Sequence, residues 1–295
     1  MNILWLWCWL SFAFAKQVDH SIKKGDTKWV FDVEWTTKNG KHHNTHFALD
    51  ADLIKEDLDE PLYFRVNKAS KYQAKKINKW AKKQKGVTIK ASSHRGKVSL
   101  EARGQNRKKV RKKMKQAEEI SEKALQEYLR KNGYLTIRGK IMPDHIRHIK
   151  EASDDLGPLL EALGGATKDP RVFARKALMF TQSIPYERRG SKPDKYRRPL
   201  SSLGRNKADC DSKTVLFLAL MHEAYPDMSL AIVYISGHAF AAIGIEPKKG
   251  DVRFRAQGEK WVGVEPVGPA LFRVGKLSAK SRRHIRTKRY HIRTL

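Results

Sequence analysis

The chain has 295 residues, 40% of them hydrophobic, which is enough to build the core of one large domain or of two ordinary ones and excludes a chain too polar to fold. Its 61 Lys and Arg outnumber its 31 Asp and Glu, which gives a formal net charge of +30 and a pI near 10.1. Such a charge attracts anionic surfaces without selecting among nucleic acid, lipid head groups and polyanionic cell-envelope polymers.

Residues 1–15 carry no charged side chain and end in Ala13-Phe14-Ala15. They have the apolar region and cleavage site of a secretory signal peptide, although the usual basic residues before it are missing. An uncleaved anchor is the alternative, but a membrane span needs about 20 apolar residues. Cleavage would remove Cys8 and leave Cys210 as the only cysteine, so no internal disulfide could form. We therefore expect a periplasmic or secreted protein, anchored in the membrane if residues 1–15 stay attached.

Residues 16–135 predict a basic α+β region. Alternating residues flank an Asn39-Gly40 turn, which is a strong hairpin signal. The remaining elements expected here are a strand at 63–66, a basic amphipathic helix at 68–83, a second hairpin at 87–102 and a long helix at 105–131.

Residues 136–275 predict a second α+β domain. Asp144, Pro158 and Asp169-Pro170 each mark a helix start, and residues 187–207 predict a basic loop. A helix follows at about 210–221, and then antiparallel strands at 230–235, 239–245, 252–255 and 261–265. The last segment, 276–295, is rich in Lys and Arg and has no acid, so we expect a flexible basic tail.

Cys210 stands out by its place in this pattern. The polar run Asp209-Cys210-Asp211-Ser212 leads directly into the apolar run 215–221, and its side chains are candidates for capping a helix. A thiol at a helix N-terminus faces the positive end of the helix dipole, which favours the reactive thiolate. We interpret Cys210 as a nucleophile, the alternative being an inert buried thiol.

A thiol nucleophile needs a base and a group that orients the base. His238 follows Gly237 at the start of an apolar strand, unlike the histidines that lie in polar segments. Glu265 ends the apolar run Trp261-Val-Gly-Val, where a carboxylate needs a partner. Glu246 and Asp251 are rival orienters, but both lie at a turn, where we expect them to be solvated.

These segments resemble the transglutaminase-like cysteine hydrolase superfamily. The matching residues are Asp209-Cys210-Asp211-Ser212-Lys213, Gly237-His238-Ala239-Phe240, Trp261-Val-Gly-Val-Glu265-Pro266 and Gln182-Ser-Ile-Pro-Tyr186. The resemblance covers about residues 140–275 and implies a papain-like core, in which a helix that bears the cysteine packs on an antiparallel sheet. It also implies that Cys210 is the nucleophile, His238 the general base and then acid, and Glu265 the orienting group, where the family more often has Asp.

The oxyanion formed during acyl transfer needs hydrogen-bond donors. The backbone N–H of Cys210 can supply one, and Gln182 is a candidate for a second, although capping or bridging near a helix end fits Gln182 better. His145 and His148 lie one helical turn apart and could contact a metal, but a third ligand is missing from the pattern. We therefore expect a solvated helix face at these two histidines, and no metal or cofactor.

The function that the sequence favours is an exported peptidase or amidase of the cysteine hydrolase type, acting on a protein or peptide substrate. Cross-linking by a transglutaminase reaction is an alternative, but it demands that water be excluded and that a second amine be bound. A catalytically idle adaptor that binds envelope polyanions or a membrane surface is a second alternative, suggested by the basic segments. Nucleic acid is less favoured, because aromatic residues do not alternate with the basic ones.

Overall fold

A computed structural model describes residues 17–295 except 38, 60–63, 138, 188–195 and 268–270. The chain forms two compact units, of which unit 1 comprises 1–60 and 145–295 and unit 2 comprises 61–144. The predicted signal peptide lies outside the described residues. The predicted boundary near residue 135 is wrong, because the first hairpin packs in one core with residues of the C-terminal half of the chain, whereas the basic helices belong to unit 2.

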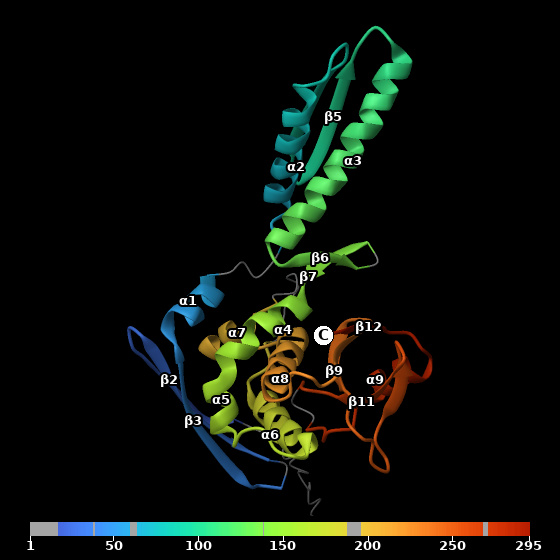
Figure 1. Ribbon diagram of the computed structural model, residues 1–295. Coiled ribbons are helices and arrows are strands. Elements are labelled where there is room, and N and C mark those ends of the chain that lie inside the picture. Colours follow the sequence, from blue (N-terminus) through green and yellow to red (C-terminus); the bar gives the residue numbers. More distant parts are fainter. Residues whose placement is uncertain (1–16, 38, 60–63, 138, 188–195, 268–270) are drawn as a thin grey trace, which may run out of the picture. The chain divides into compact units, whose positions relative to one another are not determined.

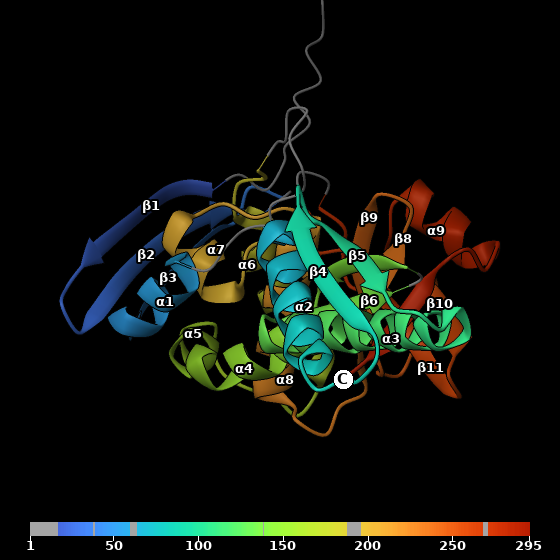
Figure 2. The same cartoon turned by 90° about the horizontal axis from the view of Figure 1, so that it is seen from above.

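The described part of unit 1 is a layered α+β structure. Figures 1 and 2 show a helical layer between a sheet formed by β1, β2 and β3 and a second sheet that contains β8, β9 and β11. The first sheet consists of the strands β1 (Gln17–Lys24), β2 (Lys28–Thr36) and β3 (His42–Asp50), all antiparallel. The structure thus confirms the hairpin predicted around the Asn39-Gly40 turn. Strand β1 was not predicted from the sequence. The rings of Trp35 and Phe47 form T-shaped contacts with the ring of Phe180 in the helical layer.

Some helices of unit 1 begin at a capping residue, and α6 is an example. Asp169 caps α6 by accepting a hydrogen bond from the Arg171 N–H, and Pro170 occupies the first turn, where its missing N–H costs nothing. The described helices of this layer are α1 (Ala51–Asp59), α4 (His145–Ser153), a 3₁₀ turn (Asp154–Leu156), α5 (Gly157–Ala162), α6 (Pro170–Ser183), α7 (Pro199–Arg205) and α8 (Cys210–Ala224). The predicted loop 187–207 is wrong at its end, because 199–205 form α7.

Helix α8 is the centre of unit 1. Its residues from Ser212 to Met221 are all buried, and they contact residues of both the helical layer and the second sheet. A helix that is apolar on every side is stable only when protein surrounds it. The first turn of α8 is therefore held in a fixed position.

The second sheet has five antiparallel strands in the order β10-β11-β9-β8-β12. They are β8 (Leu230–Ile235), β9 (His238–Ile243), β10 (Arg253–Ala256), β11 (Glu259–Val264) and β12 (His291–Thr294). Helix α8 contacts β8 and β9 on one face. The α+β class with antiparallel sheets is confirmed.

The prediction of a flexible tail at 276–295 is wrong. Ser278 caps α9 (Ala279–Arg286), and β12 pairs with β8 to complete the sheet. The physical reason is that Leu277, Ser281 and Ile292 are buried while the cations between them point outward. These few buried residues are hard to recognise in the sequence because most of their neighbours are Lys or Arg.

Unit 2 is a smaller α+β structure. Its elements are α2 (Val66–Ala81), β4 (Thr88–His94), β5 (Lys97–Arg103), α3 (Arg107–Lys131), β6 (Tyr134–Ile137) and β7 (Lys140–Pro143). Helices α2 and α3 pack on each other and on the β4–β5 hairpin around a small core that includes Ile77, Ile89 and Ala117. The two helices and the hairpin are confirmed. The predicted strand at 63–66 is wrong at its described end, because Val66 begins α2.

Candidate functional site

Cys210 is the first residue of α8 and is partly exposed. Asp209 precedes it as the N-cap, and its carboxylate accepts a hydrogen bond of 2.8 Å from the Ser212 N–H. N–H groups in the first turn of a helix have no partner within the helix, and together with the dipole they favour negative charge at this end. The predicted helix start at the polar cluster is confirmed, and the thiol lies at the positive end of a buried helix.

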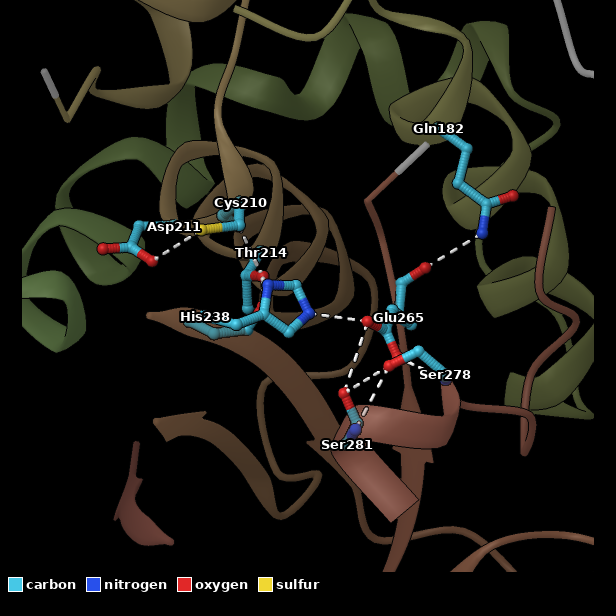
Figure 3. Close-up of polar contacts among 9 residues, drawn as sticks. Gln182, Cys210, Asp211, Thr214, His238, Glu265, Ser278 and Ser281 are labelled. Carbon is cyan, nitrogen blue, oxygen red and sulfur yellow. Dashed lines mark hydrogen bonds and ion pairs between the residues drawn. The ribbon is translucent and has the colours of Figure 1, made fainter. Parts of the chain in front are cut away.

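The thiol of Cys210 donates a hydrogen bond to the carboxylate Oδ1 of Asp211, at 3.3 Å. Figure 3 shows the sulfur turned toward Asp211, while the ring of His238 lies between the helix end and Glu265. A carboxylate beside the sulfur favours the neutral thiol, because a thiolate would face a like charge. The geometry is therefore that of a resting thiol, and attack on a substrate requires the sulfur to turn away from Asp211.

His238 and Glu265 form a close polar pair at the site. His238 begins β9 directly after the Ser236-Gly237 turn, and Glu265 follows the last residue of the neighbouring strand β11. Their Nε2 and Oε1 atoms lie 2.6 Å apart, and the two side chains are 13% and 4% exposed. Gly237 takes φ +62°, which glycine adopts without strain. The pairing of Glu265 with a histidine satisfies the need of a buried carboxylate for a partner.

Two serines hold the carboxylate of Glu265 from the other side. The Ser278 N–H donates to Oε2 at 2.8 Å, and the Ser281 hydroxyl donates to Oε1 at 3.3 Å. Burial raises the pKa of Glu265, but the hydrogen bonds from His238, Ser278 and Ser281 outweigh it, so the net pKa is lowered. The carboxylate is thus kept ionised and fixed beside the imidazole.

Thr214 connects the cysteine helix to the histidine strand. Its hydroxyl lies 2.8 Å from the carbonyl oxygen of Cys210 and 3.3 Å from that of Ala239, the residue after His238. Thr214 is itself buried. One side chain therefore bridges the backbone at Cys210 and the backbone next to His238. Figure 3 shows Thr214 beside the ring of His238.

The candidate oxyanion role of Gln182 is wrong for the observed geometry. Its Nε2 donates to the carbonyl oxygens of Glu265, at 2.9 Å, and of Phe272, at 3.0 Å. Both amide hydrogens are used in this way, and Figure 3 shows the Gln182 amide on the side of Glu265 away from Cys210. Gln182 is a bridge that fixes the backbone of Glu265.

Lys213 is a fully buried lysine in the first turn of α8. Its Nζ donates to the carbonyl oxygens of Gln182 and Ile184 at the C-terminal end of α6. A cation there meets the negative end of the α6 dipole. Burial lowers the pKa of Lys213 to about 7. A chain of contacts thus runs from the cysteine helix through Lys213 and Gln182 to the backbone of Glu265.

Two expectations about polar residues near the site are wrong. His145 and His148 are buried, and their Nδ1 atoms lie 2.7 Å from the hydroxyl of Tyr234 and 3.1 Å from that of Tyr196. The side chain of Asp251 is only 7% exposed, and it forms an ion pair of 2.8 Å with Arg171. Within the described ranges, no group of three or more His, Cys, Asp and Glu is arranged to hold a metal ion.

The residues that support the site had only weak signals in the sequence. Ser278 and Ser281 lie three apart, the spacing of a helix cap, but inside a segment dominated by charge. Lys213 and Thr214 precede the apolar run of α8, and nothing local shows that both are buried. Their partners lie far away in the chain, so only the tertiary structure identifies them.

Comparison with known proteins gives no relative. No family model matches the chain, and neither a curated protein nor a solved structure matches it. Among the residues that the structure describes, no helix is both long enough and apolar enough to cross a membrane.

Proposed function

We propose that the chain is an exported cysteine-dependent acyl-transfer enzyme of the transglutaminase-like type, acting on amide bonds in proteins or peptides. The observation that carries the proposal is the 2.6 Å contact between His238 and the buried carboxylate of Glu265. His238 begins β9, and the Thr214 hydroxyl connects this strand to the backbone of Cys210 at the start of α8. A nucleophile, a base and an orienting acid therefore come from three elements that are tied together.

The reaction follows from these roles. The free Nδ1 side of His238 takes the thiol proton, since Nε2 is engaged by Glu265, and the thiolate of Cys210 attacks the amide carbon. The imidazolium returns the proton to the leaving amine as the C–N bond breaks, which leaves a thioester on Cys210. A water molecule, deprotonated by His238, then attacks the thioester and releases the acid and the free thiol. The N–H groups at the start of α8 face the negative charge on the oxygen during both additions.

Hydrolysis is the favoured outcome. An amine in place of water would give a cross-link, but it would have to be bound and water excluded from the thioester. Cys210 is partly exposed, and this exposure supports access of water. We therefore expect a peptidase or amidase.

The proposal is tested with two substrates, a mixed fluorogenic peptide-amide library for hydrolysis and casein with a fluorescent primary amine for cross-linking. We expect turnover of the first by the wild type and its complete loss in Cys210→Ala, whose folding is checked by an unchanged melting temperature. His238→Ala should lose at least 100-fold, within the range of general acid–base catalysis. Turnover that persists in Cys210→Ala would rule out the thiol mechanism.

A second candidate function is polyanion binding by unit 2. Lys68, Lys71, Lys75 and Lys79 are all exposed and follow helical spacing along one side of α2. An anionic envelope polymer or a membrane surface suits such a row of flexible cations. This function is compatible with the enzyme, and it would stand alone if Cys210 proved unreactive.

A further inference from the structure

Unit 1 contains a cavity apart from the thiol site. A cavity of about 630 Å³ is lined by the ends of β2 and β3, by α6, and by the segments around 248–251 and 271–276. This volume suits a small organic ligand. Its lining includes Gln182 but neither Cys210 nor His238. The cavity is therefore not the place where an acyl group would meet the thiol.

The lining of this cavity is strongly cationic. Seven of its residues are Lys or Arg, against the single carboxylate of Asp251. That carboxylate is already paired with buried Arg171, and Lys276 donates to the Gly250 carbonyl. The others have no ion-pair partner among the described residues: Lys41, Arg175, Lys248, Lys249 and Arg273. Like charges so close together repel one another, and an anion between them would remove the repulsion.

The cavity also offers an apolar wall and a buried donor. Leu178, Phe272 and Val274 line it together with Trp35. The indole of Trp35 is only 3% exposed and stacks on the ring of His43 at 5.5 Å. Its Nε1–H has no hydrogen-bond partner within the described part of the chain. A buried donor of this kind is normally satisfied, and the side chain that carries it lines the cavity, so a small adjustment of the ring would let an acceptor in the cavity reach it.

We propose that this cavity binds an organic phosphate, with the phosphate held among the cations and an attached apolar group against Trp35 and Phe272. Charge alone would suit any anion, but the apolar wall and the buried indole N–H favour one with a ring or short chain that carries an acceptor. The binding does not depend on the chemistry of Cys210. The backbone around Phe272 accepts a hydrogen bond from Gln182, so an occupant would contact the same segment that supports Glu265.

The test uses the full chain labelled with ¹⁵N, in which the indole N–H of Trp35 gives its own resonance, assigned by its absence in Trp35→Phe. Phenyl phosphate is titrated, with benzyl alcohol as the neutral probe and inorganic phosphate as the probe without a ring. We expect a saturable shift of the Trp35 resonance with phenyl phosphate, at least tenfold weaker binding of inorganic phosphate, and no shift with benzyl alcohol.

A matched pair of variants separates the cavity from general electrostatics. Lys248→Gln/Lys249→Gln/Arg273→Gln removes three exposed cations of the lining, and Lys28→Gln/Lys168→Gln/Arg286→Gln removes three exposed cations elsewhere in unit 1. We expect the first to weaken phenyl phosphate at least tenfold and the second less than twofold. Equal weakening by both variants, or a shift that does not saturate, would overturn the proposal.

The source of the phosphate is distinguished with vesicles of phosphatidylglycerol. If the natural ligand is a lipid head group, the wild type should bind these vesicles and the cavity variant should lose that binding, while the control variant keeps it. If it is a free metabolite, vesicles should leave the Trp35 resonance unchanged while phenyl phosphate still shifts it. A Trp35 resonance that responds to neither would overturn the site.

Discussion

The two units differ in where they place their charged groups. Unit 2 holds 25 Lys and Arg against six Asp and Glu, and its core cluster is small. Unit 1 holds a larger core around α8, and inside it several polar side chains are buried with specific partners, among them Lys213, Thr214 and Glu265. Surface charge of one sign gives non-specific attraction, whereas buried polar contacts fix geometry. Unit 2 is therefore suited to non-specific attraction of anions, whereas the buried polar contacts of unit 1 hold side chains in fixed positions.

The largest effect is expected from removing a core side chain from each unit. Phe217→Ala empties the centre of α8 and should cost about 3–5 kcal/mol of unit 1 stability, while Ile77→Ala in α2 should cost about 2–5 kcal/mol. Peptide-resolved hydrogen exchange measures both. We expect Ile77→Ala to raise exchange within 64–144 and to leave α8 protected. Loss of protection across both units in Ile77→Ala would show that they are not separate.

Replacing Lys213 tests whether its burial in unit 1 makes the stability of the protein depend on pH. Its folded pKa of about 7 lies below the usual lysine value, so between pH 7 and 10.5 the unfolded chain binds one more proton than the folded one. Stability from this residue is therefore lowest below pH 7 and rises with pH. From pH 7 to 9, the unfolding free energy of the wild type should therefore rise by about 2 kcal/mol relative to that of Lys213→Met. Urea unfolding at both pH values measures it, and a difference that stays constant would contradict the buried charge.

Removing cations from unit 2 tests whether its surface charge attracts polyanions. Lys71→Gln/Lys75→Gln/Lys79→Gln should elute from a heparin column at clearly lower salt, because three contacts to the polyanion are lost. The variant with Lys28, Lys168 and Arg286 changed to Gln carries the same charge change in unit 1. An equal shift in both would assign heparin binding to net charge alone.

The smallest expected effect concerns Asp211. Its carboxylate accepts the hydrogen bond of the thiol, so Asp211→Asn should increase the thiolate fraction and raise the rate of Cys210 alkylation at pH 7 a few-fold. The measurement is the iodoacetamide rate with Cys8→Ser as background. A slower rate in the variant would mean that Asp211 assists the thiolate instead of holding the thiol.

Local patterns in the sequence predict much of this structure. The helix at Cys210, the strand at His238, the Asn39-Gly40 hairpin and the helices of unit 2 follow from capping residues, turns and periodicity. Patterns of this kind act over a few residues. Local patterns do not predict that the first hairpin packs on α6 and so belongs to unit 1, because the two segments are far apart in the sequence.

The support of the candidate site depends on contacts that are distant in sequence. Ser278 reaches Glu265 from a segment that resembles a charged tail, and Lys213 reaches the end of α6 from a helix start. Gln182 is present in the sequence as a possible donor to substrate, but its two hydrogens are committed to carbonyl oxygens. The identities of Cys210, His238 and Glu265 could be proposed from the sequence, whereas their supports could not. Their catalytic roles stay a prediction.

We propose that His238 and Glu265 activate the thiol of Cys210. The test is the rate at which iodoacetamide alkylates Cys210 from pH 5 to 9, measured in the Cys8→Ser background for the wild type, for His238→Ala and for Glu265→Gln. We expect the wild type to react readily at pH 6, at least tenfold faster than His238→Ala, with Glu265→Gln in between, because an imidazolium beside the sulfur stabilises the thiolate. Three identical profiles that rise only near pH 8.5, as for an ordinary thiol, would contradict the account.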